Sequence, residues 1–298
     1  MDPHWDDMKV FLAVAREESL SGAGRILKLD PATVGRRIAR LEASMETSLF
    51  VKSPQGYALS AAGERLLVHG EQAEQAMRAA GEALAGPSDT LSGQIRIGAP
   101  DGCANYLLPQ VCSRIASENP DLDIQIVAQP RVVNLSRREA DMAITVSPPT
   151  AGQLLVQKIT DYKLHLVASR RYLVNSDPIN GPEDLIGRPF IGYIPDMIFD
   201  AELDYLNELG VKRVQLASNS VPVQLKLVVQ GAGLAVAHDF TIPSHRPLRK
   251  VLADEISLTR SFYLVRHQGD QRSERLNRFA EALVDGLREE VARLENPG

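Results

Sequence analysis

The sequence predicts a helical N-terminal unit built on a winged helix-turn-helix, followed by a larger α/β unit of two lobes. Three observations carry this prediction: short helical stretches around a basic segment, one long helix after them, and strands alternating with helices to the C-terminus. At 298 residues two domains are the better expectation, since domains typically span roughly 100–200 residues. We therefore divide the chain at 1-60, 61-88 and 89-298, with a second lobe at about 164-265.

The composition is that of a globular protein without a membrane span. Hydrophobic residues make up 44% and charged residues 24% of the chain. The N-terminus carries Asp2, Asp6 and Asp7, which a signal peptide would lack, and no run of about 18 apolar residues occurs. Two cysteines, Cys103 and Cys112, cannot build a disulfide framework. We expect a cytoplasmic protein.

The first 60 residues predict three helices and a hairpin. Apolar residues repeat at helical spacing over Trp5–Arg16, and two short helical stretches follow at Leu20–Leu27 and Ala32–Ala43. Asp30 suits the N-cap of the third stretch and Pro31 its first helical position. The extended residues from Leu49 to Leu59 surround a turn sequence and predict a wing.

The segment from Ser19 to Glu42 has the features of a helix-turn-helix. Small residues at 22–24 allow two helices to cross closely, and apolar residues join them. Between Arg25 and Lys52, six basic and three acidic residues give +3 within a chain of net charge −5. Charge alone fits a solvated helix face equally well, but its position in the motif favours DNA. The expected DNA-binding residues are Ser21, Ala32, Thr33, Arg36, Arg37, Arg40, Lys52 and Ser53.

A long helix should follow from a cap at Ser60 to about Leu84. Leu66, Gly70, Ala73, Met77, Ala80 and Leu84 follow one another at alternating spacings of four and three, a narrow apolar seam. The seam could pack on its own domain, but we favour a dimer. The expected dimerisation residues are Leu66, Ala73, Met77, Ala80 and Leu84, and Gly86-Pro87-Ser88-Asp89 indicates a linker.

From Gln94 onward, strands alternate with helices. The expected strands are Gln94–Ala99, Asp123–Ala128, Asp141–Val146, Lys163–Ala168, Pro189–Tyr193, Val214–Ser218, Leu234–Ala237 and Phe262–Arg266. The expected helices are Tyr106–Ser117, Ala201–Leu209, Val223–Gln230 and about Glu274 to Leu294. Such alternation predicts parallel sheets covered by helices, in two lobes with a cleft between them.

The N-terminal motif resembles that of LysR-type transcriptional regulators. The resemblance runs without gaps from Ser19 to Glu42 and on through residues 49–53 and 59–64, with weaker matches at 107–109, 138–144 and 230–235. It implies a DNA-binding regulator with a linker helix and a two-lobed effector domain similar to type 2 periplasmic binding proteins. The family usually has serine where Gly35 stands and alanine where Gly24 stands. The implied partners are double-stranded DNA with two half-sites, a second copy of the chain in a homodimer or homotetramer, and a small effector.

Loops at strand ends predict the effector site, and the resemblance places the family's effector cleft in the same loops. The expected residues are Pro100, Asp101, Gly102, Cys103, Gln129, Arg131, Ile194, Asn219 and Ser220. Arg131 could pair with a ligand carboxylate or with a surface acid. Cys103 near a helix start could have a lowered pKa, line the pocket or simply pack. We expect a small polar ligand, with acids among the candidates.

No pattern in the sequence indicates an enzyme, a cofactor or a metal site. The six histidines lack metal-ligand spacing, Gly231-Ala232-Gly233 lacks a dinucleotide fingerprint, and no serine sits in a nucleophile elbow. If Cys103 and Cys112 shared one helix, they would lie about 13 Å apart, too far for a disulfide. The alternatives are a small-molecule-binding protein without a regulatory role and an α/β enzyme.

Overall fold

The computed structural model describes residues 4–53, 56–85, 90–128, 140–150 and 152–296, so the expected linker at 86–89 lies outside the described residues. The chain divides into two units. The first comprises Met1–Ser88 with the short segments 136–138 and 269–273, and the second comprises the remainder. Among the described residues, no helix is both long and apolar enough to cross a membrane.

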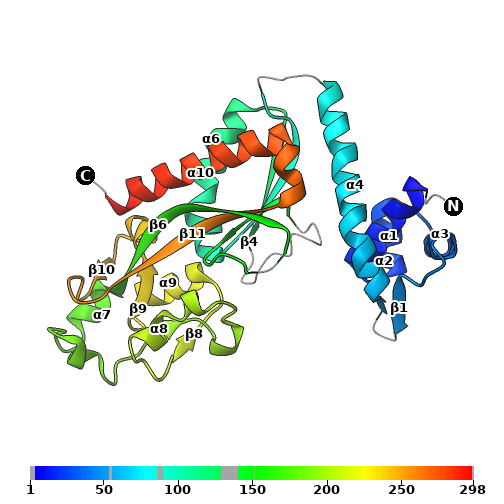
Figure 1. Cartoon of the computed structure of the whole chain (residues 1–298). Coiled ribbons are helices and arrows are strands. Elements are labelled where there is room, and N and C mark those ends of the chain that lie inside the picture. Colours follow the sequence, from blue (N-terminus) through cyan, green and yellow to red (C-terminus); the bar gives the residue numbers. More distant parts are fainter. Residues whose placement is uncertain (1–3, 54–55, 86–89, 129–139, 151, 297–298) are drawn as a thin grey trace. The chain divides into compact units, whose positions relative to one another are not determined.

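The first unit is a winged helix-turn-helix followed by a long helix (Figure 1). Its elements are α1 (Trp5–Glu17), α2 (Leu20–Leu27), α3 (Pro31–Ser44), β1 (Phe50–Ser53), β2 (Gly56–Leu59) and α4 (Ala61–Ala85). β1 and β2 pair antiparallel as the predicted wing. The predicted caps are confirmed, because Asp30 Oδ1 accepts the Ala32 amide at 2.8 Å and Ser60 Oγ accepts the Gly63 amide at 3.0 Å.

The core of this unit lies where α1, α2 and α3 meet. Phe11 and Leu12 of α1 are buried against Val34, Ile38 and Leu41 of α3. The Phe11 ring also lies 5.4 Å from that of Phe50 in the wing, centroid to centroid. Burial of this apolar stripe fixes which face of α3 turns inward, and its remaining side chains are left on the surface.

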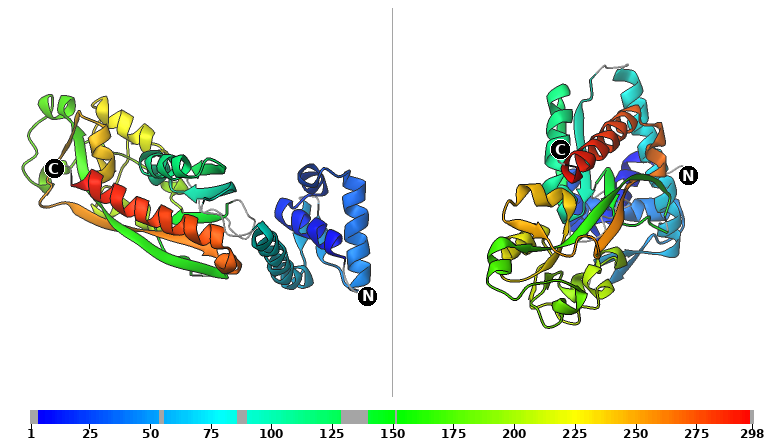
Figure 2. Two further views of the ribbon diagram at one scale, coloured as in Figure 1. Left: turned by 90° about the horizontal axis from the view of Figure 1, so that it is seen from above. Right: turned by 90° about the vertical axis from the view of Figure 1, so that its left-hand side faces the viewer.

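The second unit is built on one mixed sheet of seven strands. Its strands are β3 (Gly93–Ala99), β4 (Leu122–Ala128), β5 (Met142–Thr145), β6 (Leu154–Ser169), β9 (Ala235–His238), β10 (Leu248–Lys250) and β11 (Ser257–His267). The strand order is β10-β6-β11-β5-β3-β4, and β9 also pairs with β6. A separate pair joins β7 (Ile191–Gly192) to β8 (Leu216–Ala217). β6 and β11 run side by side through the unit (Figures 1 and 2).

Helices pack around these strands. They are α5 (Asp101–Tyr106), α6 (Leu108–Glu118), α7 (Arg170–Val174), α8 (Tyr205–Glu208), α9 (Val221–Val229) and α10 (Glu274–Glu295). Short 3₁₀ helices are η1 (Pro182–Leu185), η2 (Pro195–Met197), η3 (Ala201–Leu203), η4 (Asp239–Ser244) and η5 (Gln268–Arg272). α10 packs on α6 and β6.

The strands do not all pair in parallel, so the prediction of parallel sheets was wrong for part of this unit. β3 pairs in parallel with β4 and β5, and β7 with β8, but all contacts of β6, β9, β10 and β11 are antiparallel. β6 begins at Leu154 instead of Lys163, and β10 was not predicted. Alternation of apolar residues reveals that a strand exists, but the direction of its neighbour depends on connections that residue patterns do not encode.

Two expected helices are each broken in two. The helix expected from Tyr106, or from Cys103, to Ser117 divides at Leu107 into α5 and α6. Pro109 lacks the amide hydrogen that a continuous helix would donate to Asn105, so a new helix starts beside it. The stretch Ala201–Leu209 divides likewise into η3 and α8.

Candidate functional site

The outward face of α3 carries cations that no carboxylate neutralises. Arg36 is exposed, and its guanidinium donates to Thr33 Oγ1 at 3.0 Å. Arg37 is half-buried. Within the ranges that the structure describes, neither arginine has an ion-pair partner. Unpaired guanidinium groups beside a hydroxyl at the start of a helix are suited to phosphates and to base edges.

Arg40 on the same helix is engaged differently. Its guanidinium makes a two-point ion pair with Asp7 of α1, in which Arg40 Nε lies 2.6 Å from Asp7 Oδ2 and Nη2 bonds Oδ1. The Asp7 side chain is only 2% exposed. The hydrogen bond and the charge of Asp7 raise the pKa of Arg40. Arg40, expected on the DNA face, thus also ties α3 to α1.

Two glycines of the motif differ in what surrounds them. A Cβ on Gly24 would lie 2.6 Å from the Leu29 carbonyl oxygen, closer than a real contact allows. A Cβ on Gly35 would meet Leu20 Cδ1 at 3.4 Å, an ordinary contact. The turn of the motif therefore requires glycine at 24, whereas position 35 has room for a side chain.

The other expected DNA-binding residues lie at the start of the motif's helices or on its wing. Ser21 is exposed in the first turn of α2, and Ala32 is exposed in the first turn of α3. Lys52 and Ser53 lie on β1, where they pair with Tyr57 and Gly56 of β2.

The seam of α4 divides into two parts. A Cβ on Gly70 would lie 3.0 Å from Met8 Sδ, and Leu66 packs on the core of its own unit. Further along, Ala73 and Ala80 are exposed, and Met77 is 58% exposed. The Leu84 side chain lies outside the described residues. Intradomain packing therefore accounts for the first part of the seam and leaves the second part bare.

Asp101 joins the two lobes of the second unit. Its Oδ2 accepts the Val221 amide, the first of α9, at 2.6 Å, and its Oδ1 accepts Asn105 Nδ2 at 3.0 Å. Ser220, the N-cap of α9, makes no cap bond with its own side chain. The carboxylate of Asp101 therefore caps the start of α9 in place of the Ser220 side chain.

Two tyrosines surround this contact. Burial, and secondarily the charge of Asp101, raises the pKa of Tyr106 to about 12. The same two causes raise the pKa of Tyr193. Both phenols therefore stay neutral hydrogen-bonding groups around Asp101.

Cys103 and Gly102 lie in the packed interior behind Asp101. Cys103 is 1% exposed, and burial raises the pKa of its thiol, which corrects the expectation of a lowered value. A Cβ on Gly102 would lie 3.2 Å from His238 Cε1. Burial lowers the pKa of His238 to about 4, so its ring is neutral near pH 7.

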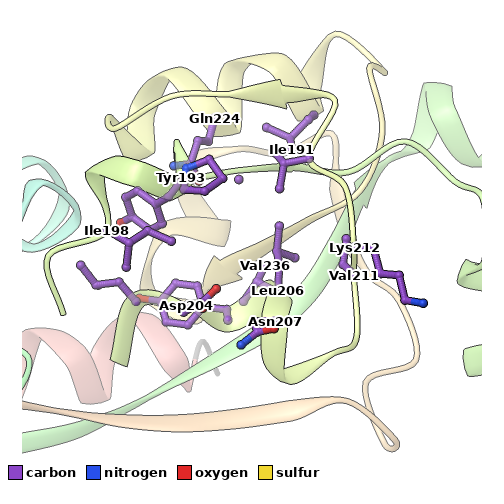
Figure 3. A pocket seen from close by; sticks show the side chains of 15 residues that line it. Ile191, Tyr193, Ile198, Asp204, Leu206, Asn207, Val211, Lys212, Gln224 and Val236 are labelled. Atoms are coloured by element: carbon purple, nitrogen blue, oxygen red, sulfur yellow. The ribbon is translucent and has the colours of Figure 1, made fainter. Parts of the chain in front are cut away.

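A cavity of 480 Å³ lies in the second lobe between β7, α8, the loop before β8, α9 and β9 (Figure 3). Its walls include Ile191, Tyr193, Tyr205, Leu206, Gln224 and Val236. Ile194 is half-buried between the lining residues Tyr193 and Pro195. The volume is in the range of sites for small molecules, roughly 300–1,000 Å³.

None of the expected effector residues that the structure describes is among the residues that line this cavity, although Ile194 lies between two of them in the sequence. Pro100 is the N-cap of α5, and Asn219 and Ser220 are half-buried before α9. Gln129 and Arg131 lie outside the described residues. Tyr205, Gln224 and Val236 were missed by the sequence reasoning, although Tyr193 ends a predicted strand and could have been found there. Among the described residues, no group of three or more potential ligands could hold a metal ion.

Comparisons with known proteins agree across both units. The model for "Bacterial regulatory helix-turn-helix protein, lysR family" matches residues 5–64, and the model for "LysR substrate binding domain" matches residues 88–288. The HTH-type transcriptional regulator DgdR of Burkholderia cepacia is 31% identical over 80% of this chain and 79% of its own. GltR of Bacillus subtilis is 26% identical over 86% of each.

Solved structures share the fold of the whole chain. A full-length OxyR variant from Pseudomonas aeruginosa superposes with a TM-score of 0.74 at 16% identity, covering 100% of this chain and 99% of that one. Full-length LysG from Corynebacterium glutamicum, solved with bound effector Arg, gives 0.66 at 19% identity, covering 97% and 99%.

Proposed function

The chain belongs to the LysR-type transcriptional regulators, a non-enzymatic family that joins a DNA-binding helix-turn-helix to an effector-binding domain, and on this premise we propose how it works. It binds an operator of two half-sites as a homodimer or homotetramer. A small molecule in the second unit changes how the subunits sit on the operator. The observation that carries the proposal is the pair Arg36 and Arg37 on α3, neither of which has an ion-pair partner among the described residues.

In this proposal α3 enters the major groove with its N-terminal residues toward the bases. Thr33 and Arg36, already bonded to each other, read base edges, whereas Arg37 and Lys52 contact phosphates. Arg40 orients α3 through Asp7 and presents its outer edge to the backbone. The wing places Lys52 and Ser53 beside the groove.

Dimerisation uses the bare part of α4. Ala73, Met77 and Ala80 lie on one stripe of the helix with little of the first unit covering them. Small residues beside an exposed methionine allow a second helix to approach closely. In the sequence, Leu84 follows Ala80 by four residues, the spacing that would continue the same stripe.

The effector acts by binding one arrangement of subunits more tightly than another, since only a difference in affinity shifts such an equilibrium. The cavity and the residues around Asp101 are the described features that support a ligand site in the second unit.

A mobility-shift assay on the DNA upstream of the chain's own gene tests the proposal, with metabolites of neighbouring pathways added. We expect a retarded complex at nanomolar protein, weakened by salt, whose affinity or mobility changes with one metabolite. Binding that does not distinguish this DNA from unrelated DNA would favour a small-molecule-binding protein without a regulatory role.

A further inference from the structure

We propose that the effector is a non-anionic molecule with an apolar body, held in the cavity between β7, α8, α9 and β9, and that Asp101 takes the place an acidic ligand would occupy. The inference rests on the proposed function, since it assigns the chemical class of the molecule that the regulator senses. Three observations support it: the lining of the cavity, the direction of the charged side chains in that lining, and the hydrogen bonds at the start of α9.

The lining combines apolar side chains with polar groups. Aliphatic side chains come from β7, α8, β9 and the loop before β8, Tyr193 and Tyr205 add two rings, and the polar side chains are Asp204, Asn207, Lys212 and Gln224. The labelled Ile191, Leu206 and Val236 project into the space in Figure 3. Such walls favour a ligand that removes apolar surface from water, with a few polar groups to fix its orientation.

The charges of the lining disfavour an anion. Among the described residues, the lining contains one carboxylate, Asp204, and one ammonium, Lys212. Figure 3 shows the Lys212 side chain leading away from the cavity, so its charge does not compensate a ligand inside. A buried anion without a cation or several donors is strongly disfavoured, whereas a neutral or cationic donor can bond a carboxylate.

The helix end that could hold an anion is already occupied. The amide of Val221 donates to Asp101, the amide of Ser220 donates to Ser218 Oγ at 3.1 Å, and Pro222 has no amide hydrogen. A ligand carboxylate would have to displace Asp101 or lie beside its charge. After burial, the charge of Asp101 is a second cause that raises the pKa of Tyr193, which lines the cavity.

A charge series of constant shape tests the proposal on the full-length protein. Benzamide, benzoate and benzamidine share one ring and differ in carrying no charge, a negative charge or a positive charge. Calorimetric titration should give affinities for benzamide or benzamidine at least tenfold above that for benzoate. Equal or tighter binding of benzoate overturns the proposal, and so does the absence of binding by all three at millimolar concentration.

Variants locate the binding and the source of the discrimination. Val214→Phe narrows the cavity and should weaken binding of the favoured probe at least tenfold. The matched variant Val174→Phe, which changes a side chain that is 83% exposed, should leave this affinity unchanged. Asp101→Asn removes the charge but keeps an oxygen for the Val221 amide. It should lower the ratio of the affinity for benzamide to the affinity for benzoate at least threefold. Asp177→Asn removes an exposed carboxylate of the same lobe and should leave this affinity ratio unchanged.

Unchanged probe binding by Val214→Phe overturns the assignment of the cavity. An unchanged ratio of benzamide to benzoate affinity in Asp101→Asn overturns the role assigned to Asp101. Affinity for the upstream DNA is measured on the same preparations. Failure of the ligand tests with DNA binding intact contradicts only this inference, whereas loss of sequence-selective DNA binding in the unmodified protein contradicts the proposed function.

Discussion

The guanidinium of Arg40 on α3 holds the carboxylate of Asp7 on α1 through two hydrogen bonds, and the Asp7 side chain is almost wholly buried. The pair links α3, the helix that we propose contacts DNA, with α1. Removing the arginine would leave a buried carboxylate without its cation, which is far less favourable than losing an exposed charge.

Arg40→Ala should therefore lower the thermal stability of the first unit, whereas Arg37→Ala should not. Arg37 has no ion-pair partner among the described residues, so its loss removes only a contact to DNA. Differential scanning calorimetry of the two variants measures the difference. Equal melting temperatures for Arg40→Ala and the unmodified protein would show that the ion pair does not hold α3.

Alanine substitutions at Gly24 and Gly35 should have opposite effects. At Gly35 the new methyl group meets only an ordinary contact, and alanine should stabilise α3 by up to about 1 kcal/mol. At Gly24 the methyl group would press on the Leu29 carbonyl oxygen, so alanine should destabilise the turn despite its better helix propensity. Chemical denaturation measures both, and stabilisation by Gly24→Ala would contradict the crossing described here.

The free energy of unfolding of the second unit should fall as the pH is lowered from about 6.5 to about 4. Burial lowers the pKa of His238 from 6.5 to about 4, so in this range the unfolded chain binds a proton that the folded protein does not. At about 1.4 kcal/mol for each pH unit, the loss reaches about 3 kcal/mol at pH 4, and the pH dependence from this group is absent above pH 6.5.

Urea denaturation of His238→Phe across this range tests the assignment. The variant should lack this component of the pH dependence, whereas His69→Phe, which changes an exposed histidine of α4, should retain it. An identical pH dependence in His238→Phe and the unmodified protein would be inconsistent with a neutral, buried His238.

Met77→Glu should weaken the dimer, because it places a charge on the bare stripe of α4. Sedimentation equilibrium at micromolar concentration measures the association. Gln72→Glu adds the same charge at an exposed position of the same helix, outside the stripe, and as the matched control it should leave the dimer intact. A Met77→Glu protein that stays dimeric would place the interface elsewhere.

Local rules allowed much of the first unit to be predicted from sequence. Asp30, Pro31 and Ser60 act at helix ends through neighbours one to three residues away, and the structure confirms them. The Asp7–Arg40 pair could not be predicted in the same way, because the two residues are 33 positions apart and meet only after α1 and α3 have packed.

The effector site depended still more on tertiary structure. The sequence singled out the loop before α5 and the start of α9, since both follow predicted strands. It could not indicate that Asp101 caps α9, 120 residues away, or that β7, α8, α9 and β9 enclose a cavity. The direction of β6 and β11 was equally hidden, because antiparallel pairing arises from the path of the chain between them.

The salt dependence of DNA binding tests the central claim most directly. Fluorescence anisotropy of the upstream DNA is measured between about 50 and 200 mM salt for the unmodified protein and for Arg36→Ala/Arg37→Ala. The double variant should remain folded, bind much more weakly and show a logarithmic salt slope lower by about one for each lost phosphate contact. A folded double variant with unchanged affinity and unchanged slope would contradict the placement of α3 on DNA.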